Sequence, residues 1–196
     1  MENKEHYIIG AHNAWSYLPV RKWWMKPFRF MAKCQSVNIR SQYFFHGVRC
    51  FDLRIRYNED GLIIAHGIIE YDYSIGSLIR DLEWLNEKGD CYVRLLFEAR
   101  NLCQYNELDA LRFRNFCKYI ESYCNTIHWW CGRNLYNWIV EYDFGIYPTC
   151  EEKYGSVSKH KWLYAWWPWL YARLHNKTIR ANETDKKILL MDYINI

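Results

Sequence analysis

The sequence YIIGAHNAW, residues 7–15, is a short apolar run that ends in a histidine, His12. The same arrangement recurs at His66, which follows the run LIIA, and at Asp192, which follows the run ILLM. Polar residues at the carboxyl ends of several strands are typical of parallel α/β barrels. The sequence therefore predicts an α/β fold, a (β/α) barrel of the TIM type.

A strand is also expected in the run VRCFDLRIR, residues 48–56, which alternates between apolar and polar residues. Its apolar positions from Phe51 to Ile55 share one face, whereas Asp52 and Arg54 share the other. Two histidines, an arginine and an aspartate are a set of side chains suited to cleaving a phosphate diester without a metal ion.

The chain has 196 residues, which predicts a single domain, residues 1–196. Barrels of this type take about 250 residues. We therefore expect a small barrel, trimmed or distorted, with short helices.

Capping residues and apolar periodicity predict the elements that follow the first strands. A helix is expected between Ser74 and Gly89, and a strand over residues 92–97 that ends at Glu98. A long helix is expected from Asn106, with these apolar residues on its inward face: Leu108, Leu111, Phe116, Tyr119 and Ile120. Further elements are expected as a helix within residues 35–46, a strand within 139–146 and a helix over 169–175.

The motifs GAHNAW, GVRCFDLRIR, AHG and LMDYIN stand in an order that resembles the catalytic region of phosphatidylinositol-specific phospholipases C. The similarity is greatest to the bacterial, metal-independent branch, and it spans the chain from Ile9 to Asn195. Each motif alone is weak, but four of them in this order are fairly specific. The resemblance implies a barrel enzyme, a lyase or hydrolase, that cleaves phosphatidylinositol or a related glycerophospholipid without a cofactor.

In that family an inositol hydroxyl attacks the adjacent phosphorus while the glycerol oxygen departs. The resemblance makes His12 the general base and His66 the general acid, and the unperturbed pKa of histidine, about 6.5, suits both roles. It makes Asp192 the group that orients His12. Arg54 is implied to hold the phosphate oxygens. For each histidine taken alone, the alternative is a structural role in a loop.

Two residues depart from the bacterial pattern. The aspartate that follows the first histidine in that branch supports the second histidine, and here it is Asn13, so Asp52 is the nearest substitute as support for His66. Glu98 stands where the bacterial branch has a lysine that contacts substrate. We assign Asn13 and Glu98 to substrate contact, with a salt bridge to Arg54 or a neighbouring arginine as the structural alternative for Glu98.

The calcium-dependent branch of the family has an asparagine and a glutamate at these two positions. Asn13, Asp52 and Glu98 therefore form an alternative set of oxygen ligands for Ca²⁺. Arg54 opposes this alternative, because it stands where the calcium branch needs a second carboxylate. We expect a metal-independent site.

Two further alternatives stay open. The glycerophosphodiester phosphodiesterases also start with a histidine at a strand end, but they need Glu-x-Asp on the second strand, where this chain has Asp52-Leu53-Arg54. The other alternative is a catalytically weak barrel that binds a membrane or a protein partner. Asn13 and Glu98 are the residues that favour it.

Residues 15–33 are rich in aromatic and basic residues and contain no acidic residue. Trp23, Trp24, Lys26 and Phe28 suit contact with an anionic membrane, because Trp prefers the interfacial zone and each cation contributes about 1 kcal/mol near anionic lipid. We expect this segment to form the membrane-facing rim of the site. The alternative is that half of its aromatic residues cover the barrel.

A second aromatic cluster, Trp166, Trp167 and Trp169, has the same two interpretations. No nucleic-acid-binding motif accompanies the basic residues, so we expect no nucleic-acid partner; the sequence leaves the oligomeric state open. The start MENKEHYIIG lacks a charged and then apolar leader, and no apolar run approaches the about 20 residues of a membrane span. We therefore expect a cytoplasmic protein at the periphery of a membrane.

The chain has eight cysteines, without a Cys-x-x-Cys pair and without the paired spacing of a zinc site. This usage predicts free, buried thiols in a reducing compartment rather than a disulfide framework.

Overall fold

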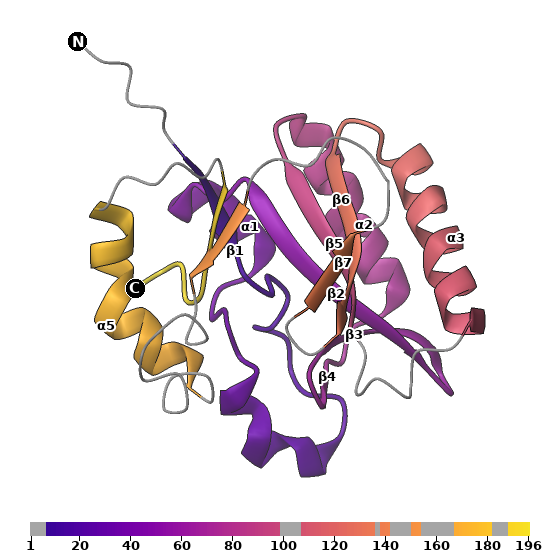
Figure 1. The fold of residues 1–196 in the computed structure, drawn as a ribbon, viewed down its shortest axis with the longest axis horizontal. Coiled ribbons are helices and arrows are strands. Elements are labelled where there is room, and N and C mark those ends of the chain that lie inside the picture. Colours follow the sequence, from indigo (N-terminus) through magenta and orange to yellow (C-terminus); the bar gives the residue numbers. More distant parts are fainter. Residues whose placement is uncertain (1–6, 99–106, 136–137, 142–149, 154–166, 182–187) are drawn as a thin grey trace.

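The fold comes from a computed structural model that describes residues 7–98, 107–135, 138–141, 150–153, 167–181 and 188–196 (Figure 1). Its elements, in chain order, are β1 (Ile8–Ala11), the 3-10 helix η1 (Trp23–Met31), α1 (Ile39–His46), β2 (Cys50–Asn58), β3 (Gly61–His66), β4 (Ile69–Glu70), α2 (Ile75–Lys88), β5 (Tyr92–Glu98), α3 (Glu107–Tyr123), β6 (His128–Leu135), β7 (Trp138–Glu141), β8 (Cys150–Lys153), α5 (Pro168–Ala181) and β9 (Ile188–Met191).

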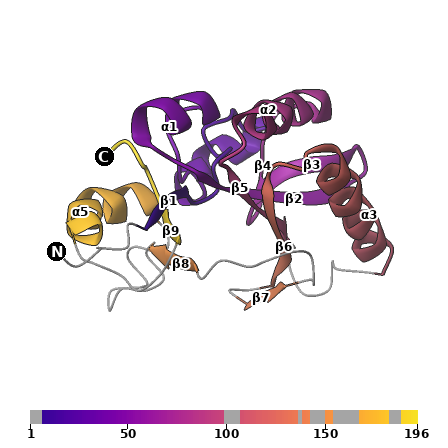
Figure 2. The same cartoon turned by 90° about the horizontal axis from the view of Figure 1, so that it is seen from above.

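One sheet of nine strands organises the described residues, in the order β7-β6-β5-β2-β1-β9-β8, with β3 paired to β2 and β4 paired to β3. From β6 to β8 along this order, each neighbouring pair is parallel. The sheet is curled, and helices α1, α2 and α3 lie along its outer side (Figure 2). The predicted α/β fold is confirmed at this level: the described residues form a curled half-barrel, and a complete TIM barrel is not seen among them.

The two faces of the sheet differ in chemistry, as the alternation in β2 predicts. Phe51 and Leu53 belong to the main hydrophobic core, together with Leu82 of α2 and Ile120 of α3. The residues on the opposite face of β2 and β5 are polar and also buried; they are Asp52, Arg54, Arg56, Arg94 and Glu98. The inner face of the half-barrel is therefore a buried charged layer, which has to be neutralised by ion pairs.

Local capping signals locate two helices. The Ser74 side chain accepts a hydrogen bond from the Ser77 backbone amide at the start of α2, and Gly89 ends that helix at φ 74°, as predicted. Helix α1 is shorter than predicted, because the Asn38 side chain caps it by accepting from the amide of Ser41.

Gly10 has a packing role. It lies within β1, and a Cβ atom on it would stand 2.5 Å from Cδ2 of Leu190 in the neighbouring strand β9. The absence of a side chain therefore lets β1 and β9 approach.

The predicted inward face of α3 is partly wrong. Phe113, Cys117 and Ile120 are fully buried. By contrast, three of the residues predicted to face inward are about half exposed; they are Leu108, Leu111 and Tyr119. Helix α3 carries apolar residues on more than one side, so its sequence did not fix which side meets the sheet. The predicted helix start at Asn106 lies outside the described residues.

Near the C-terminus, α5 begins at Pro168 and continues to Ala181, six residues beyond the predicted end at residue 175. β7 occupies part of the predicted strand region, and residues 142–149 lie outside the described part. No helix in the described ranges has the length and apolar character needed to cross a bilayer. Six cysteines of the described residues are free and buried, as expected; they are Cys34, Cys50, Cys91, Cys117, Cys124 and Cys131.

Strand β3 differs from the prediction in direction. It runs antiparallel to β2 and forms a hairpin with it, pairing Ile64 with Ile55. His66 is thus carried to the site by a hairpin, not by a parallel barrel strand. Only Glu59 and Asp60 connect the two paired strands, a connection too short for the crossover that parallel pairing needs.

Candidate active site

The candidate site lies beside the middle of β2, where the strand paired with one edge of β2 changes from β1 to β3. β1 pairs with the start of β2, at Cys50 and Phe51, whereas β3 pairs with its second half, from Ile55 onward. Asp52 and Arg54 stand between these two pairings. His12 follows the last residue of β1, and His66 is the last residue of β3, so the two histidines approach this position from opposite sides.

His12 is held by a carboxylate and a guanidinium. Its Nδ1 lies 2.7 Å from Oδ1 of Asp192, and its Nε2 lies 2.8 Å from Nη2 of Arg54. A guanidinium only donates hydrogen bonds, so in neutral His12 the Nε2 atom accepts and Nδ1 carries the proton toward Asp192. Asp192 and Arg54 together therefore fix the His12 tautomer in which Nε2 carries the lone pair. This is the form that a general base needs.

Arg54 is the centre of a buried ion-pair network. Its Nε donates to Oδ2 of Asp52 at 2.8 Å, and its Nη1 lies 3.5 Å from Oε2 of Glu98. All three side chains are nearly inaccessible to solvent. The sequence left a salt bridge between Glu98 and an arginine as an alternative to substrate contact, and this salt bridge is present.

Asp52 is fixed as a carboxylate. Burial alone would raise its pKa, but the charges of Arg54, Arg94 and His12 and a hydrogen bond from the Asn13 backbone amide hold the pKa below its ordinary range. The Nε atom of Arg94 lies 3.7 Å from Oδ1 of Asp52. Asp52 thus anchors the arginines and the backbone that follows His12.

His66 is supported differently from the sequence prediction. Its Nδ1 lies 3.0 Å from the carbonyl oxygen of Ala32, so a backbone carbonyl takes the place of a carboxylate, and Asp52 is engaged elsewhere. The two imidazole rings of His12 and His66 meet edge to face with their centroids 5.5 Å apart. Burial and then the charge of Arg54 lower the pKa of His66 to about 4.

Asn13 and Glu98 both act on the backbone around the histidines. Asn13 has a left-handed conformation with φ 43°, which asparagine adopts more readily than most residues. Its side-chain nitrogen lies 3.4 Å from the Ala32 carbonyl oxygen. Glu98 accepts a hydrogen bond of 2.7 Å from the backbone amide of Gly67, the residue after His66.

The alternative calcium ligands are placed close to an arginine. Asp52 and Glu98 both contact Arg54. A Ca²⁺ ion held by these carboxylates would lie next to a fixed positive charge. The donors are oxygen atoms, as Ca²⁺ prefers, but Arg54 already compensates their charge.

Sequence reasoning missed three buried residues of the site. The backbone amide of Cys34 donates to Ser16 Oγ, and Gln35 ties the loop after β1 to the end of β9 by donating to the carbonyl oxygens of His12 and Met191. Arg94 pairs in register with Asp52. A charge inside the apolar strand was a signal for Arg94, whereas nothing in the local sequence marked Cys34 or Gln35.

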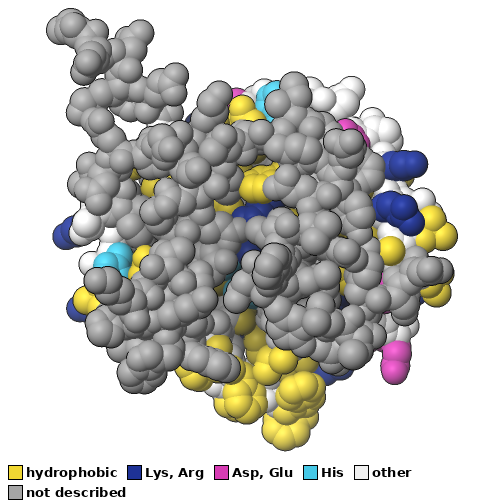
Figure 3. Space-filling model, in the orientation of Figure 1, with side chains coloured by type: hydrophobic (Ala, Val, Ile, Leu, Met, Phe, Trp, Pro, Cys, Tyr) yellow, Lys and Arg dark blue, Asp and Glu magenta, His cyan; other side chains and the backbone are white. Residues whose placement is uncertain are grey.

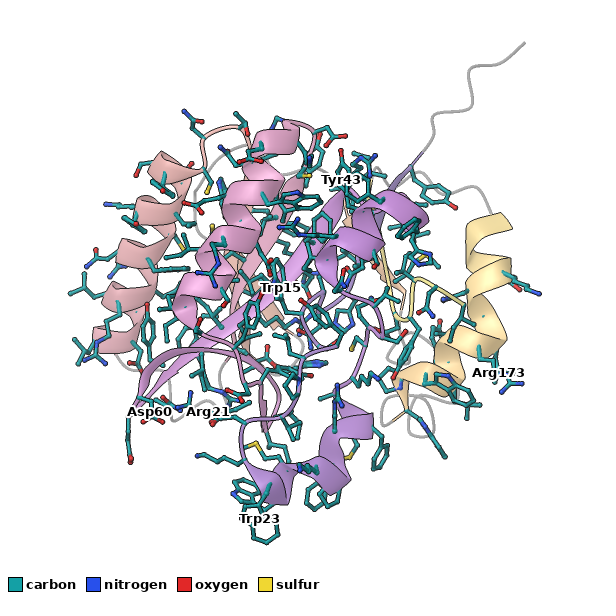
Figure 4. The ribbon with its side chains drawn as sticks, turned by 180° about the vertical axis from the view of Figure 1, so that it is seen from behind. Trp15, Arg21, Trp23, Tyr43, Asp60 and Arg173 are labelled. Carbon is teal, nitrogen blue, oxygen red and sulfur yellow. The ribbon has the colours of Figure 1, made fainter. Side chains whose placement is uncertain are left out.

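The aromatic segment η1 runs directly into the site. The carbonyl of Ala32, one residue beyond η1, contacts His66, and Met25 anchors η1 as a fully buried side chain. Trp23 is 80% exposed, and Trp24 and Phe28 are 45% exposed. Exposed hydrophobic side chains gather at the lower edge of the molecule, where η1 lies (Figure 3), and Trp23 projects outward there (Figure 4).

The second aromatic cluster joins this surface. Trp167 is 45% exposed, and its ring meets that of Phe30 at a centroid distance of 6.0 Å. Trp166 lies outside the described residues. In contrast, Trp15 at the start of the same segment is fully buried and donates to Asp81. The alternative that some of these aromatics cover the core is therefore confirmed for Trp15.

Part of the basic charge of the segment is neutralised by acidic residues from elsewhere. Arg21 pairs with Asp60 at 2.9 Å, and Lys22 lies 3.6 Å from Glu70. Arg29 donates to backbone carbonyls within the segment. Lys26, which is exposed among the aromatic rings, remains in the position predicted for it.

The described residues thus combine a curled, mainly parallel half-barrel sheet with a buried histidine–carboxylate–arginine network beside its strand ends. In fold this chain is similar to the phosphatidylinositol-specific phospholipase C from Listeria monocytogenes, with a TM-score of 0.63 and 14% sequence identity. The similarity covers 98% of this chain and 91% of that one. No protein-family model and no curated protein sequence matches the chain.

Proposed function

We propose that this protein cleaves the phosphodiester bond of phosphatidylinositol or a related glycerophospholipid by general acid–base catalysis with two histidines. The observation that carries the proposal is the buried network from Asp192 through His12 and Arg54 to Asp52, with His66 beside it. The fold shared with a bacterial phospholipase C of this specificity supports the substrate class.

The roles are those that the family resemblance implies, and the contacts described above are compatible with them. Nε2 of His12 takes the proton of a substrate hydroxyl, which attacks the phosphorus and forms a cyclic phosphate. Asp192 stabilises the imidazolium that results. Arg54 faces Nε2 of His12, so it is placed to hold a phosphate oxygen next to the base and to stabilise the charge that gathers there. His66 gives a proton to the departing glycerol oxygen.

The ionisation of His66 matters for this role. Its pKa of about 4 means that the imidazole is neutral at pH 7 before substrate binds. A bound phosphate diester brings a negative charge that favours the imidazolium and raises the pKa. We therefore expect His66 to become protonated, and so able to act as the general acid, when the substrate binds.

The proposal is tested by turnover of radiolabelled phosphatidylinositol in mixed vesicles, with and without a chelator. We expect cleavage to a cyclic inositol phosphate and diacylglycerol, and we expect it to persist in chelator, because Arg54 supplies the charge that a calcium ion would otherwise provide. Turnover that is lost in chelator and restored by calcium would instead assign Asn13, Asp52 and Glu98 to a metal site.

A second candidate function is a catalytically weak barrel that binds membranes. The low pKa of His66 and the absence of a carboxylate among its contacts in the described residues favour it. Complete absence of turnover, with lipid binding intact, would support this second function. A glycerophosphodiester phosphodiesterase is disfavoured, because Arg54 stands where that chemistry needs a metal-binding carboxylate.

We further propose that η1 with Trp167 forms the surface that contacts the membrane, which would make the protein peripheral at a cytoplasmic leaflet. The surface combines exposed Trp23, Trp24 and Phe28 with Lys26, and its inner end contacts His66 through Ala32. A lipid bound there can present its head group to the site without leaving the bilayer.

Replacing Trp23 and Trp24 together by alanine is expected to weaken partition onto anionic vesicles by about tenfold or more, since each exposed ring would bury apolar area in the interface. Cleavage of a water-soluble substrate and the melting temperature should change little, because neither ring is in the core. Vesicle sedimentation and a melting curve on the same variant measure both effects.

Phe44 and Phe45 provide a matched control. They are 61% and 80% exposed and belong to α1, whose Tyr43 lies at the opposite end of the molecule from Trp23 (Figure 4). The double alanine variant of this pair removes two exposed rings but should leave vesicle binding unchanged. Equal losses in both double variants would argue against a membrane surface at η1.

A further inference from the structure

Cys34 is a buried thiol within the candidate site that the proposed reaction does not use. Its Sγ lies 3.8 Å from Nδ1 of His66, and the side chain is fully buried. Sγ and one ring nitrogen each of His12 and His66 lie within 4.8 Å of one another. Two imidazoles and a thiol at this spacing form a set of ligands for a divalent ion with affinity for sulfur.

The spacing is close to that of a zinc site. Zinc binds sulfur at about 2.3 Å and imidazole nitrogen at about 2.0 Å, so neighbouring ligand atoms of a tetrahedral site stand roughly 3.5 Å apart. The 3.8 Å between Sγ of Cys34 and Nδ1 of His66 already approaches this value. The remaining separations, within 4.8 Å, need to shorten by up to about 1.3 Å, which requires side-chain rotation.

The backbone that carries two of the ligands is fixed. Ser16 Oγ accepts hydrogen bonds from the backbone amides of Cys34 and Gln35, at 2.9 and 2.8 Å. The Gln35 side chain donates to the carbonyl oxygen of His12 at 3.1 Å. The loops that follow β1 and η1 are thereby held together, and a metal ion would not have to gather its ligands from mobile segments.

The contact of His12 with Asp192 matches that found around metal-bound imidazoles. Such an imidazole usually uses one nitrogen for the metal and donates from the other to a carboxylate or a backbone carbonyl. Nδ1 of His12 contacts the carboxylate of Asp192, and Nδ1 of His66 contacts the carbonyl of Ala32. In His12, Nε2 is the nitrogen that would bind a metal, in place of its present hydrogen bond with Arg54. In His66, Nδ1 is the nitrogen that lies 3.8 Å from Sγ of Cys34, so a metal there would replace the contact with the Ala32 carbonyl.

We propose that His12, Cys34 and His66 form an inhibitory site for a thiolate-binding divalent ion of the zinc type. Binding follows from the ligand geometry alone, whereas inhibition rests on the proposed function. A bound ion takes the lone pairs through which the two histidines would exchange protons with substrate. Coordination converts the thiol to a thiolate, with its proton released to solvent, and no redox change occurs.

The positive charge of Arg54 repels this ion less than it would repel calcium. A zinc ion with one thiolate carries a net charge of +1, the same charge that the site must hold when His12 becomes an imidazolium during the proposed reaction. Asp192 and Asp52 lie beside His12 to balance it. The ion does replace the hydrogen bond between Arg54 and Nε2 of His12. A calcium ion would bring a charge of +2 and prefers oxygen ligands to sulfur.

The test of binding uses cobalt as a spectroscopic probe for the zinc site. The full chain, freed of metal by chelation and desalting, is titrated with Co²⁺ alone. We expect one equivalent of Co²⁺ to produce a cobalt–thiolate absorption band in the near ultraviolet. Added Zn²⁺ should displace the cobalt and abolish the band. In Cys34→Ser the band should be lost and the affinity should fall by about 100-fold or more, since even changes outside the ligand set cost about 10–100-fold.

Cys124→Ser is the matched control. It removes another fully buried thiol, one that lies in the hydrophobic core, and should leave the cobalt band intact. Absence of the band in the unaltered protein, or its persistence in Cys34→Ser, would overturn the proposal. If circular dichroism shows that Cys34→Ser does not fold, Cys34→Ala replaces it with the same expected loss.

The test of inhibition is separate. Zinc should suppress phosphatidylinositol turnover of the unaltered protein at the concentrations that displace cobalt, whereas Cys34→Ser should keep its turnover at those concentrations. Equal zinc inhibition of both proteins would refute an inhibitory role for Cys34. If the unaltered protein shows no turnover in chelator or in calcium, the proposed function fails, and the cobalt titration still decides whether the metal site exists.

Discussion

Replacing His12 by alanine is expected to lower kcat for phosphatidylinositol cleavage by about 10⁴-fold, and replacing His66 by about 10²–10⁴-fold. The larger effect is assigned to His12 because it is fixed by both Asp192 and Arg54, whereas Nδ1 of His66 contacts a backbone carbonyl and a thiol. Initial rates on mixed vesicles, normalised to folded protein by circular dichroism, measure both.

A change of leaving group separates the two roles. A phosphodiester with a nitrophenol leaving group departs without a proton, so it needs no general acid but still needs the base. With this substrate, His66→Ala should recover most of its activity, and His12→Ala should stay inactive. Recovery of the His12 variant instead of the His66 variant would exchange the two assignments.

His128→Ala serves as the control for both replacements. His128 begins β6, is exposed and stacks on Tyr92 at a centroid distance of 4.7 Å, away from the network around Arg54. Its replacement should leave turnover of both substrates unchanged. A comparable loss in this variant would indicate that the two site variants lose activity through folding rather than chemistry.

Replacing Arg54 by lysine is expected to lower kcat by about 10²–10³-fold, which is the cost of removing one donor that stabilises charge in a transition state. Lysine keeps the charge that pairs with Asp52 and Glu98 but loses the planar fork that contacts both carboxylates and Nε2 of His12. Arg54→Ala should in addition be destabilised by about 3–5 kcal/mol, because it leaves buried carboxylates without a partner.

Arg54→Asp tests the origin of metal independence. It places a third carboxylate next to Asp52 and Glu98, which are both ion-paired to Arg54 in the unaltered protein. We expect this variant to be inactive in chelator and to regain part of its turnover in millimolar calcium, because oxygen ligands without a competing cation suit that ion. Calcium binding is followed by the increase in melting temperature. Unchanged melting with calcium would show that the remaining geometry does not support a calcium site.

The sequence alone determined the elements whose signals are local. The strand at Ile8–Ala11, the alternation from Phe51 to Ile55, and the helix between Ser74 and Gly89 were all predictable. Each depends on periodicity or on a cap within a few residues, and both signals can be read directly from the sequence. The polar residues that end or interrupt these strands were visible for the same reason.

The tertiary structure decided which of those polar residues meet. His12 and Asp192 are 180 residues apart in sequence and 2.7 Å apart in space, because β1 and β9 pair in register from Ile8 to Ala11. The antiparallel return of β3, which brings His66 to the site, differs from the parallel barrel strand that was expected.

The placement of Cys34, of the Ala32 carbonyl and of the exposed face of η1 also came only from the tertiary structure. Cys34 is 22 residues from His12 and 32 from His66. Its approach to them depends on the hydrogen bond that Ser16 Oγ accepts from the Cys34 amide and on the one that Gln35 donates to the His12 carbonyl, and no periodicity encodes either. Sequence patterns record how a segment is bounded and which of its faces is apolar. The contacts of a site depend on strand order and register, which are set by packing among segments far apart in the chain.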